Sequence, residues 1–387
     1  MSAAKLFFFS ITSSFLIILL LFSGNATYGG SDFLSYYTGA LLIKNGQGKN
    51  LYTIDVQKSY QQKIVQLQRI KLLPFKSLPF AAALFLPFAY FPYLQSYMIF
   101  AILNFILLLF FIRLAQKVFI QLKNTVVLGL LTFGYLPNIH TLLIGQTSLI
   151  LSLVFLFIYI TLKYKNSFLV GLLCGLILFK VQYLILLPFL FFLVHDKRSY
   201  IAGVLVSMSF LVLFSVYLVG WHEFARYPAF VLKTEQPEYG NVYWHPFTLY
   251  AMIRSIPFFS LIGNFYLLCI NTLFYISTLV FFAIKSRGKN LEIPFVFAIC
   301  MTILFSIHAL AHDLAILMTP ILILLNEACS LAGRQRTTTL FLATILYSLM
   351  FFLITPGILQ IHFNFAPLVL LGIGLYLMKT NFIVSSK

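Results

Sequence analysis

Long apolar runs recur from one end of this sequence to the other, and they constrain the fold more than any other feature. Runs of about twenty apolar residues are typical of membrane-spanning helices, because a helix of that length crosses the hydrocarbon core of a bilayer. The chain is 61% hydrophobic and only 9% charged, which is not the balance of a soluble domain. An outer-membrane barrel is excluded too, since its strands would alternate apolar and polar residues over a short period. The sequence therefore predicts an all-α polytopic membrane protein.

About twelve segments have the apolar character expected of transmembrane helices. The first is interpreted as an uncleaved signal anchor, because its apolar run is long for a cleaved signal peptide and other spans follow it. Residues 79–92 are also apolar, but they include three prolines and are too few to span, so a re-entrant or interfacial segment is predicted there. The predicted spans are residues 6–22, 94–112, 125–136, 147–162, 168–179, 183–194, 201–219, 261–284, 293–309, 314–325, 338–354 and 365–378.

Lys and Arg residues gather in the short connections between these spans, at residues 113–123, 163–165, 197–198, 285–289, 334–336 and 379–387. The positive-inside rule places such connections in the cytoplasm, so residues 24–93 form a long first extracytoplasmic loop and residues 220–260 a second. Basic helix ends also account for the net charge of +17, with membrane lipids as partners and no nucleic acid. We expect residues 1–387 to form a single domain in the cytoplasmic membrane of a bacterium.

The chain has only nine carboxylates, so the position of each one is informative. Asp32 lies ten residues beyond the first predicted span, at the start of a long polar stretch. A carboxylate near the membrane is unfavourable unless it is solvated or paired, and this favours a functional role over the alternative of a helix cap. We expect Asp32 to be a catalytic base at the outer face. Asp55 and Asp313 are the alternative bases.

Lys180 and His312 are the main candidates for binding an anion. Lys180 ends an apolar segment, so its ammonium must either snorkel to the interface or meet a negative charge. His308 and His312 are four residues apart and could share one face of a helix. The third ligand and the general-base Glu of a zinc motif are missing, so no metal site and no cofactor are predicted, although a divalent metal is not excluded. A phosphate- or sugar-binding role is favoured for His312.

Further candidates lie in the predicted outer loops and in one polar turn. Gln146 follows Gly145 in a turn where either simple helix termination or a hydrogen bond to a sugar hydroxyl would explain it. Aromatic rings stack on sugar faces, but they also anchor proteins at the membrane interface. The remaining candidates are Arg226 and Arg254 for the donor phosphate, and Tyr36, Tyr37, Trp244 and His245 for the sugar or acceptor.

Several of these residues occur together in an order that resembles a known family. The order is Asp32, Tyr36-Tyr37, Gly46, Leu51-Tyr52, a Pro-rich apolar segment, Asn104, Gly145-Gln146, Lys180, and His312-Asp313 before Pro320. It is similar to family 87 of the glycosyltransferases, the polyprenyl-phosphate-mannose-dependent mannosyltransferases of the GT-C fold. Two departures are Val181, where the family often has Pro, and residues 221–260, which match no part of the pattern and leave the acceptor open.

The resemblance implies both a fold and a reaction. The fold would be a GT-C-type bundle with its active site at the extracytoplasmic face. The reaction would move a sugar, mannose in the family, from a polyprenyl phosphate to a glycan or glycolipid acceptor with inversion at the anomeric carbon. The resemblance carries the role of base to Asp32 and favours contact between Lys180 and the donor phosphate.

Two other classes of membrane protein remain as alternatives. A transporter or flippase of lipid-linked sugars would need a similar number of spans, but it should show inverted repeats and ionisable residues near the bilayer midplane. This chain places nearly all of its charges at the ends of the predicted spans, which argues against that class. An outer-face glycan polymerase or ligase would depend on arginines of the outer loops rather than on Asp32.

Overall fold

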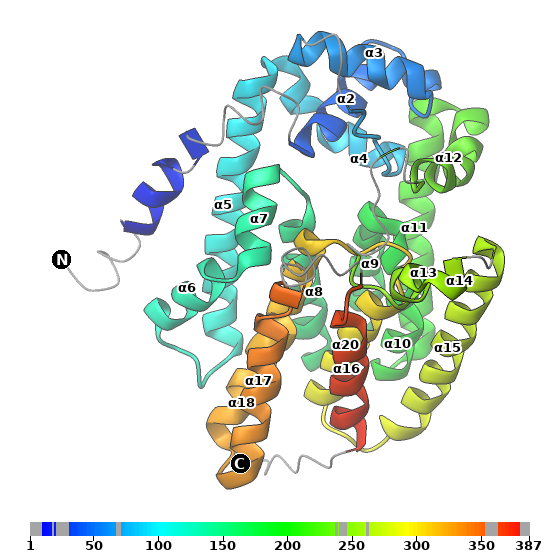
Figure 1. The fold of residues 1–387 in the computed structure, drawn as a ribbon. Helices are drawn as coiled ribbons and strands as arrows, with labels where there is room; N and C mark the ends of the chain where they lie inside the picture. Colours follow the sequence, from blue (N-terminus) through cyan, green and yellow to red (C-terminus); the bar gives the residue numbers. More distant parts are fainter. Residues whose placement is uncertain are drawn as a thin grey trace.

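The structure is a computed structural model that describes residues 10–17, 19–20, 31–66, 71–236, 239, 246–260, 263–352 and 363–379. Within these ranges every regular element is a helix, as Figure 1 shows, so the predicted all-α class is confirmed. Trp244 and His245 lie outside the described residues, as does part of the first predicted span.

Apolar helices packed side by side form the body of the molecule (Figure 1). They bury a continuous hydrophobic core, because each presents a broad apolar face to its neighbours. These helices are α5 (Tyr93–Val118), α6 (Thr125–Phe133), α7 (Leu136–Ile144), α8 (Ser148–Lys163), α9 (Ser167–Gly175), η3 (Leu176–Ile185), α10 (Leu186–Leu193), α11 (Lys197–Val219), α15 (Asn264–Lys285), α16 (Glu292–Phe305), η5 (Ala311–Leu317), α17 (Met318–Ser330), α18 (Gly333–Tyr347) and α20 (Ala366–Lys379).

Five of the described helical stretches are long and apolar enough to cross a membrane, and the pair α6 and α7, bent by 62°, would make a sixth. The other apolar helices, α8, α16 and α20, are shorter than the usual span. The chain therefore has the character of an integral membrane protein, but the predicted number of about twelve spans is not confirmed.

The stretch Ser167–Leu193 counts as one of these five by length, yet its chain reverses at Lys180. The backbone of Lys180 is not helical, with φ −135° and ψ 88°. The backbone N–H of Asp196 donates to Ser167 Oγ at 2.9 Å, which places the two ends of the stretch side by side. The Tyr200 hydroxyl contacts both arms. α9 and α10 are thus the arms of a helical hairpin, and Lys180 lies at its tip.

A compact group of short helices covers one end of the bundle, at the top of Figure 1. The first part of the chain forms α2 (Phe33–Lys44), η1 (Gly48–Asn50), α3 (Ile54–Val65), α4 (Pro79–Leu84) and η2 (Leu86–Tyr90), and α12 (Trp221–Thr234) joins them. Aromatic packing fastens α2 to the bundle, since the Phe33 ring stacks on Phe100 of α5 with a centroid distance of 5.2 Å. Residues 79–92 form two short helices there, and their relation to the membrane stays a prediction.

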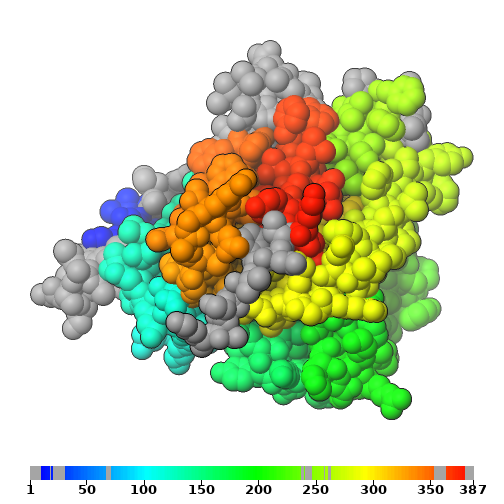
Figure 2. All heavy atoms as spheres, turned by 90° about the horizontal axis from the view of Figure 1, so that it is seen from below, coloured from blue at the N-terminus to red at the C-terminus, as the bar shows by residue number. Residues whose placement is uncertain are grey.

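The connections rich in Lys and Arg lie at the opposite end of the bundle. Lys163 pairs with Glu292 at 3.4 Å, so the ends of α8 and α16 meet there. The Gln121 N–H donates to Asn326 Oδ1 at 3.0 Å, which adds the end of α17 to the same place. Figure 2 looks onto this end, with the orange, yellow and green segments of the bundle exposed on it. Asp32 and the basic connections therefore occupy opposite ends.

Two more short helices precede α15: α13 (Leu249–Ser255) and α14 (Pro257–Ser260). The Phe247 N–H donates to the Ala309 carbonyl at 2.8 Å, which ties the segment before α13 to the loop before η5. The Asn364 Nδ2 donates to the Pro246 carbonyl at 3.2 Å, so the start of α20 joins the same corner. These bonds hold the loop that leads into η5, the helix that carries His312 and Asp313.

Glycines set the distance between α9 and α11. A Cβ atom on Gly171 would lie 2.7 Å from the backbone nitrogen of Val204, and one on Gly175 would lie 2.5 Å from Ser207 Cβ. Gly171 faces Val204 and Gly175 faces Ser207, so the contacts progress in the same direction along both helices. α9 and α11 therefore run parallel. Small residues spaced four apart allow such close approach between apolar helices.

We predict that Gly171→Ala lowers the free energy of unfolding by about 1–3 kcal/mol, because the new methyl group has no room against the α11 backbone. Gly372→Ala is the matched control, since a Cβ at Gly372 of α20 meets nothing within 4 Å. Alanine also favours helix over glycine by up to about 1 kcal/mol, so the control should be as stable as the wild type or more so. Thermal unfolding in detergent measures both. Equal melting temperatures for the two variants would contradict the close packing.

Candidate active site

Asp32 stands at the first position before α2, but its side chain does not cap that helix. The Phe33 N–H donates instead to Ser31 Oγ at 3.2 Å. Asp32 Oδ2 accepts a hydrogen bond of 2.8 Å from Gln146 Nε2, a residue 114 positions further along the chain. The alternative interpretation of Asp32 as a helix cap is therefore wrong, and its carboxylate points to the segment between α7 and α8.

Gln146 connects Asp32 to Tyr36. The Tyr36 hydroxyl donates to Gln146 Oε1 at 3.1 Å and lies 3.1 Å from Thr147 Oγ1. Burial raises the pKa of the Tyr36 phenol well above its usual range, and the charge of Asp32 adds to the effect. Tyr36 is therefore a neutral hydrogen-bond donor at physiological pH. The sequence predicted sugar contacts for Tyr36 and Gln146, and in this structure the two bond to each other.

Lys180 and Asp313 form a buried ion pair, with side chains 8% and 1% exposed. Lys180 Nζ also donates to Ser148 Oγ at 2.9 Å, and Ser148 Oγ in turn lies 3.2 Å from Asp313 Oδ1. The Leu310 N–H donates to Asp313 Oδ2 at 2.9 Å. Because its ammonium is buried and paired, Lys180 does not snorkel. A charge buried in an apolar bundle needs such partners to be tolerated.

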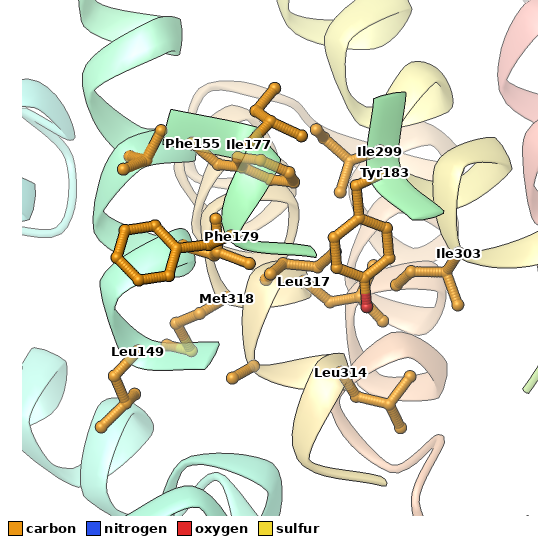
Figure 3. Packing of buried hydrophobic residues seen from close by; sticks show 14 of the residues in the cluster. Leu149, Phe155, Ile177, Phe179, Tyr183, Ile299, Ile303, Leu314, Leu317 and Met318 are labelled. Carbon is orange, nitrogen blue, oxygen red and sulfur yellow. The ribbon is translucent and has the colours of Figure 1, made fainter. Parts of the chain in front are cut away.

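Apolar side chains pack around the segments that carry Lys180 and Asp313. Figure 3 shows Phe179 and Tyr183, which lie on either side of Lys180 in the chain, among residues of α8, α16, η5 and α17. The labelled neighbours include Leu149, Leu314 and Leu317, all buried. Low polarity around the pair strengthens the attraction between the two charges.

Three consecutive residues join the two carboxylates into one site. Gln146 bonds to Asp32, Thr147 lies against Tyr36, and Ser148 bonds to Lys180. They form the turn between α7 and α8 and the first position of α8, directly after Gly145, whose φ of +68° ends α7. Asp32 and Asp313, from opposite ends of the chain, thus lie on either side of one short polar segment.

His140 belongs to the same site, although its sequence context indicates no role for it. Its ring lies 6.1 Å from the ring of His312, and it is within electrostatic reach of both Asp32 and Asp313. His140 Nδ1 is buried without a hydrogen-bond partner among the described residues. The His312 Nε2 atom lies 3.5 Å from Asp313 Oδ2. A polar run in an otherwise apolar segment, His140-Thr141 and then Gly145 to Ser148, was the available signal.

The other sequence candidates are placed elsewhere. Asp55 is exposed in the first turn of α3, where the helix dipole favours a carboxylate. Arg226 pairs with Glu223 at 2.8 Å, and Arg254 donates to the Tyr250 hydroxyl at 3.2 Å. The Tyr37 hydroxyl donates to the backbone carbonyl of residue 91 at 2.8 Å. None of these contacts reaches the Asp32 and Lys180 groups.

The prediction that His308 and His312 share one helical face is wrong. The helix begins only at Ala311, and His308 lies in the loop before it. His308 Nδ1 contacts Glu235 Oε2 at 2.9 Å, and Lys76 Nζ contacts Glu235 Oε1 at 2.8 Å. Nothing in the local sequence around Glu235 signals this cluster, because its three members come from three separate loops.

Among the described residues, no group of three or more His, Cys, Asp or Glu side chains is arranged to hold a metal ion. The site instead contains hydrogen-bond donors, one ammonium and two carboxylates. Such a set can accept a proton, hold an anion and bind hydroxyl groups.

Glu235→Gln should lower stability in a pH-dependent way. Burial raises the pKa of the Glu235 carboxyl, but His308 and Lys76 outweigh it and bring the pKa from its ordinary 4.5 to about 2. A depressed pKa stabilises the fold at neutral pH, and this contribution disappears as the pH falls through the folded-state value. The difference in melting temperature between wild type and variant should therefore shrink from about pH 5 to about pH 2. A difference that stays constant over this range in thermal unfolding would contradict the assignment.

The comparisons with known proteins give one match. The model of glycosyltransferase family 87 matches residues 79–310, whereas no curated protein and no solved structure matches the chain. The matched range includes Gln146, Ser148 and Lys180; Asp32 precedes it and Asp313 follows it. Because the match spans more than half of the sequence, the chain belongs to glycosyltransferase family 87 and is a glycosyltransferase with membrane helices.

Proposed function

We propose that this glycosyltransferase moves a sugar, mannose by the family resemblance, from a polyprenyl phosphate to an extracytoplasmic glycan or glycolipid. The observation that carries the proposal is the meeting of Asp32 with the Lys180 group across the turn of residues 146–148. A carboxylate and a buried ammonium that bond to the same short segment can supply the two functions that transfer from a phosphate ester requires. The supporting geometry involves residues from four separate parts of the chain.

Asp32 acts as the general base in this proposal. Its carboxylate takes the proton from an acceptor hydroxyl as that oxygen forms a bond to the anomeric carbon. The bond between that carbon and the phosphate oxygen breaks at the same time, and its electron pair leaves with the phosphate. Attack from the face opposite the phosphate inverts the anomeric centre.

Lys180 and the neighbouring histidines stabilise the leaving phosphate. A polyprenyl phosphate departs as an anion, so a cation and hydrogen-bond donors can replace a general acid. An ammonium has three N–H donors, and two of those of Lys180 point to Ser148 and Asp313. The third has no partner among the described residues and is available to a phosphate oxygen. His312 lies beside this position.

Asp313 holds Lys180 in place and is a poor second base. Its two oxygens accept from Lys180, Ser148 and the Leu310 N–H, so they have little capacity left for a substrate proton. The side chain is also almost fully buried. Asp32, by contrast, is only partly buried and has one neutral hydrogen-bond partner.

The proposed face of the membrane follows from charge. The basic connections lie at the end of the bundle opposite Asp32, and the positive-inside rule assigns that end to the cytoplasm. The site would then face outside, in the bacterial cytoplasmic membrane by our expectation. A donor whose polyprenyl chain lies in the bilayer would present its phosphate at this outer end.

We predict that Asp32→Asn abolishes transfer while the protein still folds, because an amide cannot accept the proton. The assay uses purified protein in detergent, radiolabelled polyprenyl-phosphate-mannose and a membrane extract as acceptor source. Asp55→Asn is the matched control, since Asp55 is an exposed carboxylate of the same terminal region. Transfer that persists in Asp32→Asn at near the wild-type rate would eliminate Asp32 as the base. Donor that crosses a proteoliposome membrane unchanged would favour a flippase.

Lys180→Met should impair both folding and donor binding. Removing one partner of a buried ion pair leaves the other charge unpaired, at a cost of about 3–5 kcal/mol in stability. The double variant Lys180→Met/Asp313→Leu removes both charges and should recover part of that loss, yet it should still fail to bind the donor phosphate. Thermal unfolding and donor titration separate the two effects. A double variant with the wild-type KM for the donor would contradict the phosphate role.

A further inference from the structure

We propose that Gln146 is a positioning residue that aims the Asp32 carboxylate at the acceptor hydroxyl, with Tyr36 and Thr147 acting through it. This inference rests on the proposed role of Asp32 as the base. Three hydrogen bonds carry it: from Gln146 Nε2 to Asp32, and from the Tyr36 hydroxyl and the Thr147 N–H to Gln146 Oε1. The sequence alone suggested that Gln146 meets a sugar hydroxyl, so the structure gives it a different partner.

The partners of Gln146 determine which way its amide faces. Oε1 lies 3.3 Å from the Thr147 backbone nitrogen, which can only donate. That atom must therefore be the carbonyl oxygen, and the NH2 group is left to face Asp32. The Tyr36 hydroxyl, kept neutral by burial, donates to the same oxygen. Asp32 Oδ2 is consequently held by a donor of fixed orientation.

The backbone around Gln146 is anchored to α2, the helix that follows Asp32. Ser31 Oγ donates to the Ile144 carbonyl at 2.8 Å, and a Cβ on Gly145 would lie 2.7 Å from Phe33 Cβ. The Gln146 N–H donates to the Thr141 carbonyl at 3.1 Å. The end of α7 and the start of α2 are thus in direct contact on either side of the bond between Gln146 and Asp32. This contact fixes the relative position of the two backbone segments from which the Gln146 and Asp32 side chains extend.

A neutral partner suits a base better than a cation does. An ammonium or guanidinium beside a carboxylate favours its charged form and weakens it as a proton acceptor, whereas an amide orients it with a smaller effect. The structure separates these roles, since Lys180 bonds to Asp313 and an amide bonds to Asp32. Gln146 uses only Oδ2, so Oδ1 of Asp32 has no partner among the described residues and is the oxygen that would receive the proton.

Kinetics of two Gln146 variants test the role. Gln146→Leu removes the N–H that bonds to Asp32. It should lower kcat on the order of 10-fold to 100-fold, because the base is no longer held in position, with little change in the KM for the sugar donor. Gln146→Glu places a second carboxylate next to Asp32. Two adjacent carboxylates hold a proton more tightly, so the acidic limb of the kcat profile should move to higher pH by about one unit. A purely structural role would lower activity equally at every pH.

The controls address charge and neighbouring titratable groups. Gln335→Glu and Gln335→Leu make the same changes at an exposed residue of α18, far from Asp32 in the fold, and should leave the pH profile unchanged. The titratable groups within electrostatic reach of Asp32 include Tyr36 on α2, Tyr93 on α5 and His140 on α7. His140→Gln, combined with Gln146→Glu, shows whether the shifted limb belongs to the histidine. A shift that disappears with His140 would overturn the assignment to Asp32.

A double-mutant cycle distinguishes Tyr36 acting through Gln146 from Tyr36 binding sugar. Tyr36→Phe alone should reduce kcat by less than Gln146→Leu does, because the Thr147 N–H still holds the amide. In the Gln146→Leu background the same change should have no further effect on kcat, since the residue it acts through is gone. Independent, multiplicative losses would mean that Tyr36 contacts the substrate directly, and the proposed relay would then be wrong.

A readout without turnover separates this inference from the proposed function. The bond between Asp32 and Gln146 should appear as coupling in thermal unfolding: Gln146→Leu lowers the melting temperature of the wild type more than that of Asp32→Ala. If wild-type protein fails to transfer sugar, the proposed function fails while this coupling still tests the contact. If transfer occurs and Asp32→Asn is inactive, but Gln146→Leu keeps the wild-type kcat and pH profile, only the positioning role is overturned.

Discussion

The burial of one ammonium group determines how the inner part of this protein is arranged. Lys180 lies at the tip of a helical hairpin inside an apolar bundle, where an unpaired charge would be very unfavourable. Asp313 pairs with it, and Ser148 bonds to both. This requirement brings the hairpin of α9 and α10, the start of α8 and the helix η5–α17 to one point. A polar site inside a membrane helix bundle is thereby built from charges that stabilise one another.

The two carboxylates of the site differ in their partners, and that difference suggests a division of labour. Asp313 has a cation, a hydroxyl and a backbone N–H, which hold it as a structural counter-ion. Asp32 has one amide, is less buried, and keeps one oxygen open. When two carboxyl groups in one site have such different surroundings, one can act as a base while the other stays charged and holds a cation in place. The buried phenol of Tyr36 stabilises this arrangement without adding a charge.

Much of the fold class followed from the sequence because apolar length and basic connections are local signals. The singling out of Asp32, Lys180 and Asp313 followed from the rarity of charge in such a chain. The partners could not be predicted in the same way: the bonds from Gln146 to Asp32 and from Lys76 to Glu235 join residues more than a hundred positions apart. The loop before η5 also separated His308 from His312, because helix periodicity alone does not show where a helix begins.

The range matched by the family model covers only part of the candidate site. The matched range, residues 79–310, contains Gln146, Ser148 and Lys180, but neither of the two carboxylates of the site. Each carboxylate is nevertheless bonded to a residue inside that range, Asp32 to Gln146 and Asp313 to Lys180. The matched segment therefore supplies the turn and the cation that organise the site, while segments at either end supply the acids. A chain that kept the matched segment but moved either end would lose these contacts, because the bond from Gln146 to Asp32 requires α2 to lie against the end of α7.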